Sequence, residues 1–155
     1  MKKTLLAAFL LFGAPFVQST FARLMYDWSY QELFDKSDFV VIANPVSRTR
    51  DTSERTILRD IQENVIGLET QFETQVVLKG TKRARFMLHH YRSVPSRVAV
   101  LNGPLFMIFD PKRGTNVYVL FLKREPDGRF APTGGQTDIH ISVREMRSPS
   151  GMSSG

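Results

Sequence analysis

Apolar and polar side chains alternate along two neighbouring stretches of this chain, and this pattern limits the folds open to it. Between residues 68 and 78 the alternation places Phe72, Val76 and Leu78 on one face, and polar side chains on the other. A second alternating stretch, 83–89, follows after a short turn-forming segment. A period of two residues is typical of a strand with one buried and one wet face. The two stretches therefore predict a β-hairpin.

Further short apolar segments continue the pattern. Residues 38–46 are rich in β-branched side chains, and 105–109 and 117–122 are continuous apolar runs. Such runs, bounded by turn formers, predict strands whose two faces are both covered. Residues 129–131 predict one more short strand, and 139–143 predict either a last strand or a helical turn. The fold class predicted is mainly β.

Only one helix is expected. Ser29 and Glu32 have the spacing of a capping box, and the apolar positions behind them predict a short helix that ends near Lys36. The polar segment 47–55 predicts a connection. Several short strands with one helix and no alternation of strands with helices favour a small barrel or sandwich.

The first residues have the pattern of a cleaved export signal. Lys2 and Lys3 precede the apolar segment 4–17, which is shorter than the ~20 residues of a membrane-spanning helix. Small residues at Thr20 and Ala22 predict cleavage after Ala22. We therefore expect a signal peptide at 1–22, one domain at 23–147 and a flexible Ser/Gly/Pro tail at 148–155. The expected location is the bacterial periplasm or the exterior of the cell.

The chain contains no cysteine, which matters for an exported domain. Disulfides, lipid attachment to cysteine and thiol catalysis are excluded, so the fold depends on its core. Removal of the leader with Lys2 and Lys3 lowers the formal net charge from +6 to +4, with 19 basic and 15 acidic residues left. The mature domain is therefore only mildly basic.

Several short motifs resemble one family when taken in order. They are 38–44 (DFVVIAN), 76–80 (VVLKG), 118–122 (YVLFL), 127–136 (DGRFAPTGGQ) and 142–146 (SVREM). Together they resemble exported bacterial proteins that are similar to the netrin-like, metalloproteinase-inhibitor-type (TIMP-like) OB barrel. The resemblance implies a small OB-like β-barrel, closed or partly open.

The animal inhibitors of this fold chelate a protease zinc ion through an amino-terminal cysteine. This chain has Arg23 at its predicted mature terminus and no cysteine, so we do not carry that mechanism over. His89 and His90 are adjacent and point to opposite faces of a strand, and His140 is distant, so we expect no metal site or cofactor. No His-Glu-x-x-His motif or phosphate-binding loop is present. We therefore expect no enzymatic activity.

Two groups of residues are candidates for binding. Lys82, Arg83 and Arg85 lie in a basic run that could join Arg129 and other basic turns in one positive surface. The alternative is that basic side chains at exposed turns serve solubility. In the loop 132–138, Gln136 and Asp138 could bind a ligand, or could instead satisfy buried backbone groups.

We therefore predict a monomeric, non-catalytic binding module of the cell envelope. Its partner is expected to be an envelope protein, a polysaccharide or an anionic surface, and not a nucleic acid. Two other functions stay open at this point: a protease inhibitor that acts through a loop, and an envelope enzyme with an unfamiliar site.

Overall fold

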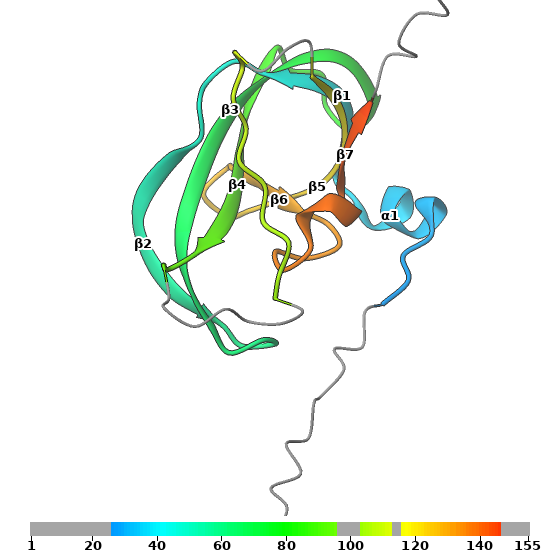
Figure 1. Ribbon diagram of the computed structural model, residues 1–155. Helices are drawn as coiled ribbons and strands as arrows, with labels where there is room; N and C mark the ends of the chain where they lie inside the picture. The colour runs from blue at the N-terminus through cyan, green and yellow to red at the C-terminus, as the bar shows by residue number, and fades with distance from the viewer. Residues whose placement is uncertain (1–25, 96–102, 113–115, 147–155) are drawn as a thin grey trace, which may run out of the picture.

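A computed structural model describes residues 26–95, 103–112 and 116–146 (Figure 1). The predicted signal peptide, 1–22, and tail, 148–155, lie outside the described residues. The elements are α1 (Tyr30–Lys36), β1 (Phe39–Pro45), β2 (Arg50–Leu58), β3 (Glu63–Lys79), β4 (Arg85–Ser93), β5 (Val117–Arg124), β6 (Phe130–Pro132), the 3-10 helix η1 (Ile139–Ile141) and β7 (Val143–Met146).

Five strands close into an OB-like barrel. Around the ring, β1 pairs with β3, followed by β4, β6 and β5, and β5 pairs back with β1. The pairing of β4 with β6 is parallel, and the other strand pairs of the described part are antiparallel. β2 pairs with β3 and β7 pairs with β5, which extends the sheet outside the ring. This confirms the predicted fold class.

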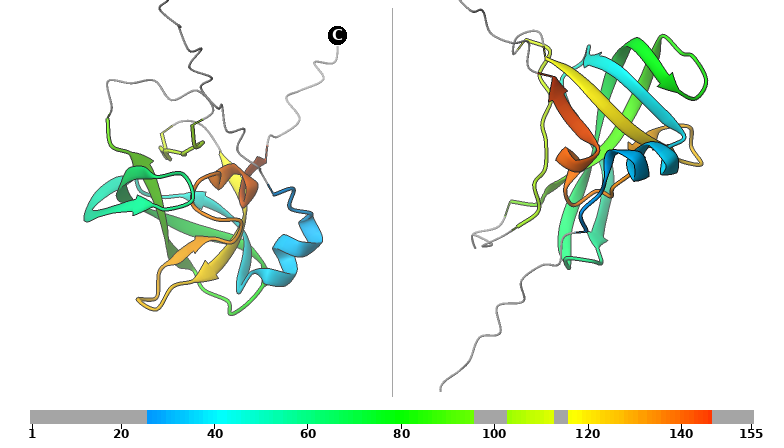
Figure 2. Two further views of the ribbon diagram at one scale, coloured as in Figure 1. Left: turned by 90° about the horizontal axis from the view of Figure 1, so that it is seen from below. Right: turned by 90° about the vertical axis from the view of Figure 1, so that its right-hand side faces the viewer.

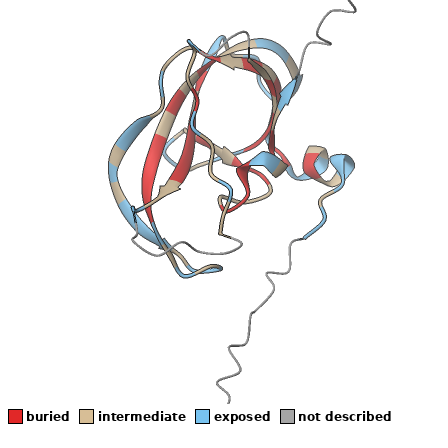
Figure 3. Ribbon diagram, in the orientation of Figure 1, coloured by how far each residue is buried: buried red, intermediate tan, exposed pale blue. Residues whose placement is uncertain are grey.

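Large apolar side chains fill the barrel. Figure 3 shows long buried stretches on the strands of the ring. Phe72, Phe86 and Phe109 belong to the buried core cluster. Phe72 stacks on Phe86 with centroids 5.6 Å apart and meets Phe109 edge-on at 5.1 Å. Outside the barrel, α1 lies beside β5 (Figure 2) and packs Leu33 against a smaller cluster that includes Phe121.

The helix α1 forms where the capping box predicts it. The Glu32 amide donates to Oγ of Ser29 at 3.1 Å, and the Ser29 amide donates to the Glu32 carboxylate at 3.0 Å. At the other end, Nζ of Lys79 donates to the carbonyl of Phe34 at 2.7 Å. A cation at the carboxyl end of a helix satisfies free carbonyls and complements the helix dipole.

The side chains of Val76 and Leu78 do not share the buried face of Phe72, so that part of the strand prediction is wrong. Opposite β1, β3 carries one extra residue at Gln75 and another at Leu78. Each bulge shifts the alternation by one position and moves the following side chains to the other face. Val76 and Leu78 are therefore about half exposed, and Val77 packs against the core.

Residues 105–109 do not form the predicted strand. Leu105 makes a single bridge, to Asp138, and the side chains of Leu105 and Ile108 are exposed. Phe109 turns into the core, where its amide donates to Oγ1 of Thr49 at 2.9 Å. The Thr49 amide donates to the Phe109 carbonyl at 3.2 Å, so this end of the segment is held by single contacts and not by a ladder of strand pairs.

The predicted polar connection at 47–55 is also incorrect, because β2 begins at Arg50. β2 lies outside the barrel, and a strand at a sheet edge can be polar on both faces. The segment 139–143 contains the helical turn η1, and β7 begins at its last residue. The predicted strands at 38–46, 117–122 and 129–131 are present as β1, β5 and β6.

Candidate functional site

The basic residues predicted to bind an anion differ in their surroundings. Lys82 is exposed in the turn between β3 and β4. The Arg83 guanidinium instead lies over the ring of Phe130, 4.8 Å from its centroid. Arg85 forms an ion pair with Glu73, with 3.1 Å between Nη2 and Oε1. Two of the three cations are therefore already engaged within the domain.

The barrel does bring two basic turns together. A Cβ on Gly80, before Lys82, would meet the Asp38 carbonyl oxygen, and the Arg124 amide donates to the Asp38 carboxylate at 2.9 Å. Backbone of the turn before Lys82 and of the end of β5 thus meets at Asp38. Arg129, which the sequence also assigns to this surface, points instead to a group of carboxylates on another face.

The two predicted polar residues of the loop 132–138 point inward. Nε2 of Gln136 donates to the His89 carbonyl at 3.1 Å, while its Oε1 is buried with no hydrogen bond to the described residues. Asp138 is 5% exposed, and its carbonyl accepts a hydrogen bond from the Ile141 amide at 3.0 Å. The contact of Gln136 with the His89 carbonyl favours the structural alternative for Gln136, and Asp138 is buried.

His89 and His90 lie on opposite faces of β4, as the strand geometry predicts. His90 faces the barrel core, where its ring meets Phe109 edge-on with centroids 5.3 Å apart and its Nε2 is 3.0 Å from Oγ1 of Thr70. Burial lowers the pKa of His90 to about 3, and the neighbouring His89 adds to this effect. His89 faces outward, yet only 3% of it is exposed.

A bulge in β2 explains why His89 is covered. Between Asp51 and Arg55, the pairing of β2 with β3 skips residues, and this folds Glu54 over the outer face of β3. Gly67 makes the close approach possible, because a Cβ there would lie 2.8 Å from Cβ of Glu54. Glycine inside a strand often marks such an approach, and a bulge re-aims a side chain.

Glu54 and Glu125 hold the His89 ring between them. Nδ1 of His89 donates to Glu125 at 2.8 Å, and Nε2 lies 3.1 Å from Oε2 of Glu54, without the alignment of a hydrogen bond. The Tyr91 hydroxyl donates to the other oxygen of Glu54. Burial, and then this hydrogen bond, raise the pKa of Tyr91.

Arg129 lies at the edge of the same group of side chains. Its guanidinium is 2.6 Å from Asp127 and 3.2 Å from Glu69, and it lies within 3.7 Å of Glu54 and Glu125. Hydrogen bonds from Arg129, first from its amide and then from its side chain, lower the pKa of Asp127. We call this set the His89 cluster: Glu54, Glu69, His89, Tyr91, Glu125, Asp127 and Arg129.

The His89 cluster holds more negative than positive charge. Four carboxylates face one guanidinium, which leaves an excess of three negative charges when His89 is neutral and two when it is protonated. The side chains of Glu54, Glu69 and Glu125 are 34%, 26% and 25% exposed, so solvent reaches them only in part. Chemically, such a surface favours a positively charged ligand group.

The sequence reasoning missed this cluster. Its members come from β2, β3, β4 and the turn after β5, so no local motif connects them. The available signals were Gly67, directly after the β-branched Val65 and Ile66, and Glu54 in a polar segment. Within residues 26–95, 103–112 and 116–146, no group of three or more His, Asp or Glu side chains is placed to hold a metal ion.

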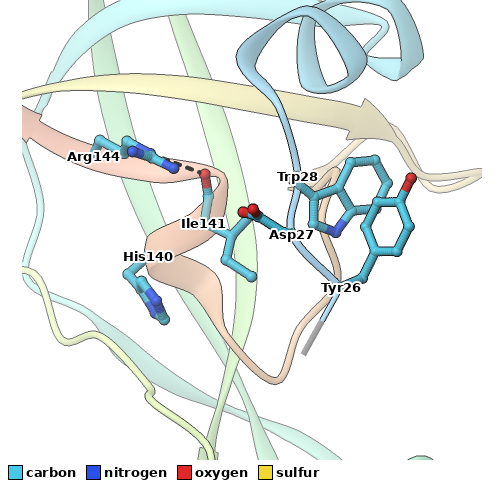
Figure 4. A pocket seen from close by; sticks show the side chains of 6 residues that line it. All are labelled: Tyr26, Asp27, Trp28, His140, Ile141 and Arg144. Atoms are coloured by element: carbon cyan, nitrogen blue, oxygen red, sulfur yellow. Dashed lines mark hydrogen bonds between the residues drawn. The ribbon is translucent and has the colours of Figure 1, made fainter. Parts of the chain in front are cut away.

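A pocket of about 430 Å³ lies elsewhere, where the segment before α1 meets η1 and β7 (Figure 4). Its lining residues are Tyr26, Asp27, Trp28, His140, Ile141 and Arg144. Figure 4 shows the two aromatic rings on one side and the side chains of His140 and Arg144 on the other. It shares no residue with the His89 cluster.

In the part of the chain that the structure describes, no helix is long and apolar enough to cross a membrane. Comparison of the chain with protein-family models, with curated proteins and with solved structures gives no match. The resemblance of the sequence to the TIMP-like barrels therefore stays a prediction.

Proposed function

We propose that this protein is an exported, non-catalytic binding module of the bacterial cell envelope, and that it binds a cationic group of its partner on the outer face of β2, β3 and β4. The observation that carries this proposal is the excess of partly buried carboxylates in the His89 cluster. The export pattern of residues 1–22 supports the location.

The way in which the cluster is assembled supports a binding role. The β2 bulge and Gly67 place the Glu54 carboxylate beside His89, where it adds to a charge excess that Arg129 does not neutralise. Like charges that are held together and partly shielded from water repel one another. A lysine or arginine side chain from a partner would relieve this repulsion, and cationic groups across interfaces give specificity in this way.

The overall charge of the chain makes the test specific. The mature domain carries a formal charge of about +4 by the predicted cleavage, so long-range attraction works against a polycation. Binding of a labelled hexa-arginine peptide would therefore require a local acidic site on the domain. We expect saturable binding of this peptide by fluorescence anisotropy, and no binding of hexa-glutamate at this site.

A double variant, Glu54→Gln with Glu125→Gln, should weaken peptide binding at least about tenfold, or 1.4 kcal/mol. The matched control is Asp60→Asn with Glu63→Gln at the turn between β2 and β3, which removes the same charge away from the cluster. Equal binding by both double variants would refute the site. Melting curves of both variants show whether a loss of binding comes from unfolding.

A further inference from the structure

The pocket where the segment before α1 meets η1 and β7 has an aromatic wall. The rings of Tyr26 and Trp28 meet edge-on, with centroids 5.1 Å apart and planes at 74°. Trp28 also packs against the small core cluster under α1, and Nζ of Lys36 lies 4.8 Å from its ring centroid. The Tyr26 hydroxyl donates to Glu32 at 2.7 Å. These contacts hold both rings from outside the pocket.

The polar side of the pocket contains a guanidinium that is already oriented. Nη1 of Arg144 donates to the Tyr30 hydroxyl at 2.8 Å, and Nε donates to the Ile141 carbonyl at 3.3 Å. The guanidinium carbon also lies 4.6 Å from the centroid of the Tyr30 ring. A donor held in this way loses little conformational entropy when it binds a ligand.

Two further polar side chains, Asp27 and His140, line the pocket. Asp27 and His140 are exposed, and neither forms a hydrogen bond or ion pair with the described residues. Asp27 offers only acceptors, Arg144 only donors, and the His140 ring has one nitrogen of each kind when it is neutral. The pocket thus combines donors, acceptors and apolar ring surface.

This combination discriminates between ligand classes. A simple anion would be opposed by Asp27, and a simple cation would be opposed by Arg144. A sugar ring has hydroxyl groups that both donate and accept, and a C–H face that packs against the apolar body of tyrosine and tryptophan. The pocket volume of about 430 Å³ also lies in the range of small-molecule sites. We propose that this pocket binds a saccharide.

Trp28 makes the proposal directly testable, because it is the only tryptophan of the chain. The full chain is titrated with maltotriose, cellotriose and tri-N-acetylchitotriose while the tryptophan emission is recorded. We expect a saturable change with at least one of them, with a Kd on the order of 1 mM. The single indole N–H signal in a proton–nitrogen NMR spectrum should shift over the same concentrations.

Variants distinguish binding in the pocket from a general effect of charge and from unfolding. Asp27→Asn and His140→Ala should each weaken saccharide binding at least about tenfold, because Asp27→Asn replaces a charged acceptor oxygen with a donor and His140→Ala removes both ring nitrogens. Asp60→Asn, which removes a carboxylate from the turn after β2, should bind as the wild type does. Melting curves identify any variant that fails to fold. If a variant does not fold, the indole signal of the wild type still shows whether a saccharide binds.

The proposal is overturned if none of the three saccharides changes the emission or the indole signal up to about 10 mM, well above the expected Kd. It is also overturned if Asp27→Asn and Asp60→Asn bind equally well, or if only inorganic phosphate or benzoate perturbs Trp28. Because the pocket and the His89 cluster share no residue, either result leaves the peptide-binding proposal to its own test.

Discussion

Replacement of Gly67 by alanine tests how the His89 cluster is assembled. A Cβ at this position would lie 2.6 Å from Oγ1 of Thr52 and 2.8 Å from Cβ of Glu54. The Thr52 hydroxyl can rotate, but Cβ of Glu54 is attached to the backbone, so β2 itself must move. Gly67→Ala should therefore destabilise the domain and displace the Glu54 carboxylate from His89.

Two effects of opposite sign set the magnitude. Overpacking costs about 1–3 kcal/mol, whereas alanine restricts the unfolded chain and contributes about 0.4–1 kcal/mol of stability. The clash is the larger effect and leaves a net loss of roughly 0.5–2 kcal/mol. For a domain of this size, that loss lowers Tm by roughly 2–8 °C.

Thermal unfolding followed by circular dichroism measures the loss of stability. An absorbance titration of tyrosine measures the displacement of Glu54. Because the hydrogen bond to Glu54 helps to raise the pKa of Tyr91, displacement of Glu54 should lower that pKa. As a control, Gly67→Ala should cost less in a Glu54→Gly background, where the opposing Cβ is absent. A Gly67→Ala protein with the Tm of the wild type, or a higher one, would refute the reasoning.

Three further outcomes follow from the contacts described above. Ser29→Ala should lower the unfolding free energy by about 1 kcal/mol in urea titrations, through loss of the helix cap, whereas Ser29→Asp should retain most of it. Gln136→Ala should also lower the free energy of unfolding by about 1 kcal/mol, because the His89 carbonyl loses its hydrogen-bond donor. An unchanged Tm together with lost peptide binding would instead show that Gln136 contacts the ligand. The pKa of His90 is about 3 in the folded protein and near 6.5 in the unfolded chain. Between these pH values the unfolded chain binds more protons than the folded protein. The free energy of unfolding therefore falls as the pH decreases from about 6.5 towards 3. His90→Leu should flatten that decrease in urea titrations at several pH values, and an unchanged slope would show that His90 does not cause it.

The basic surface predicted from the sequence can be tested in the same preparation. If the basic run forms an anion site, charge reversal of Lys82, Arg83 and Arg85 should lower the salt concentration at which the protein leaves heparin, because three positive charges become negative. Identical elution would exclude this surface as an anion site. Arg83 also packs over Phe130, so the melting temperature of the variant is measured beside its elution.

Local patterns were sufficient for much of the fold. The capping box of Ser29 and Glu32 defines α1 because its hydrogen bonds span only three residues. The apolar strands β1 and β5 and the opposite directions of His89 and His90 also follow from short-range geometry. A small barrel or sandwich, with a closed or partly open barrel implied by the resemblance, follows because apolar strands need paired edges and a common core, and the structure shows the closed form.

The errors arise where a remote segment decides the outcome. Val76 and Leu78 face solvent because bulges opposite β1 shift the alternation, and no residue of β3 by itself reveals the register of its partner. Residues 105–109 make a single bridge, from Leu105 to Asp138, and their apolar run by itself does not reveal that no longer pairing forms. Register and closure depend on pairing between segments that are distant along the chain.

The amino-acid sequence by itself determined the β class, the position of the helix and the absence of disulfide chemistry, since these depend on neighbouring residues or on composition. Only the tertiary structure decided which charged groups meet. It brought Glu54, His89, Glu125 and Arg129 together from three segments and placed Trp28 opposite Arg144. Electrostatic and ligand contacts depend on distance in space, and folding sets those distances only after every strand has found its register.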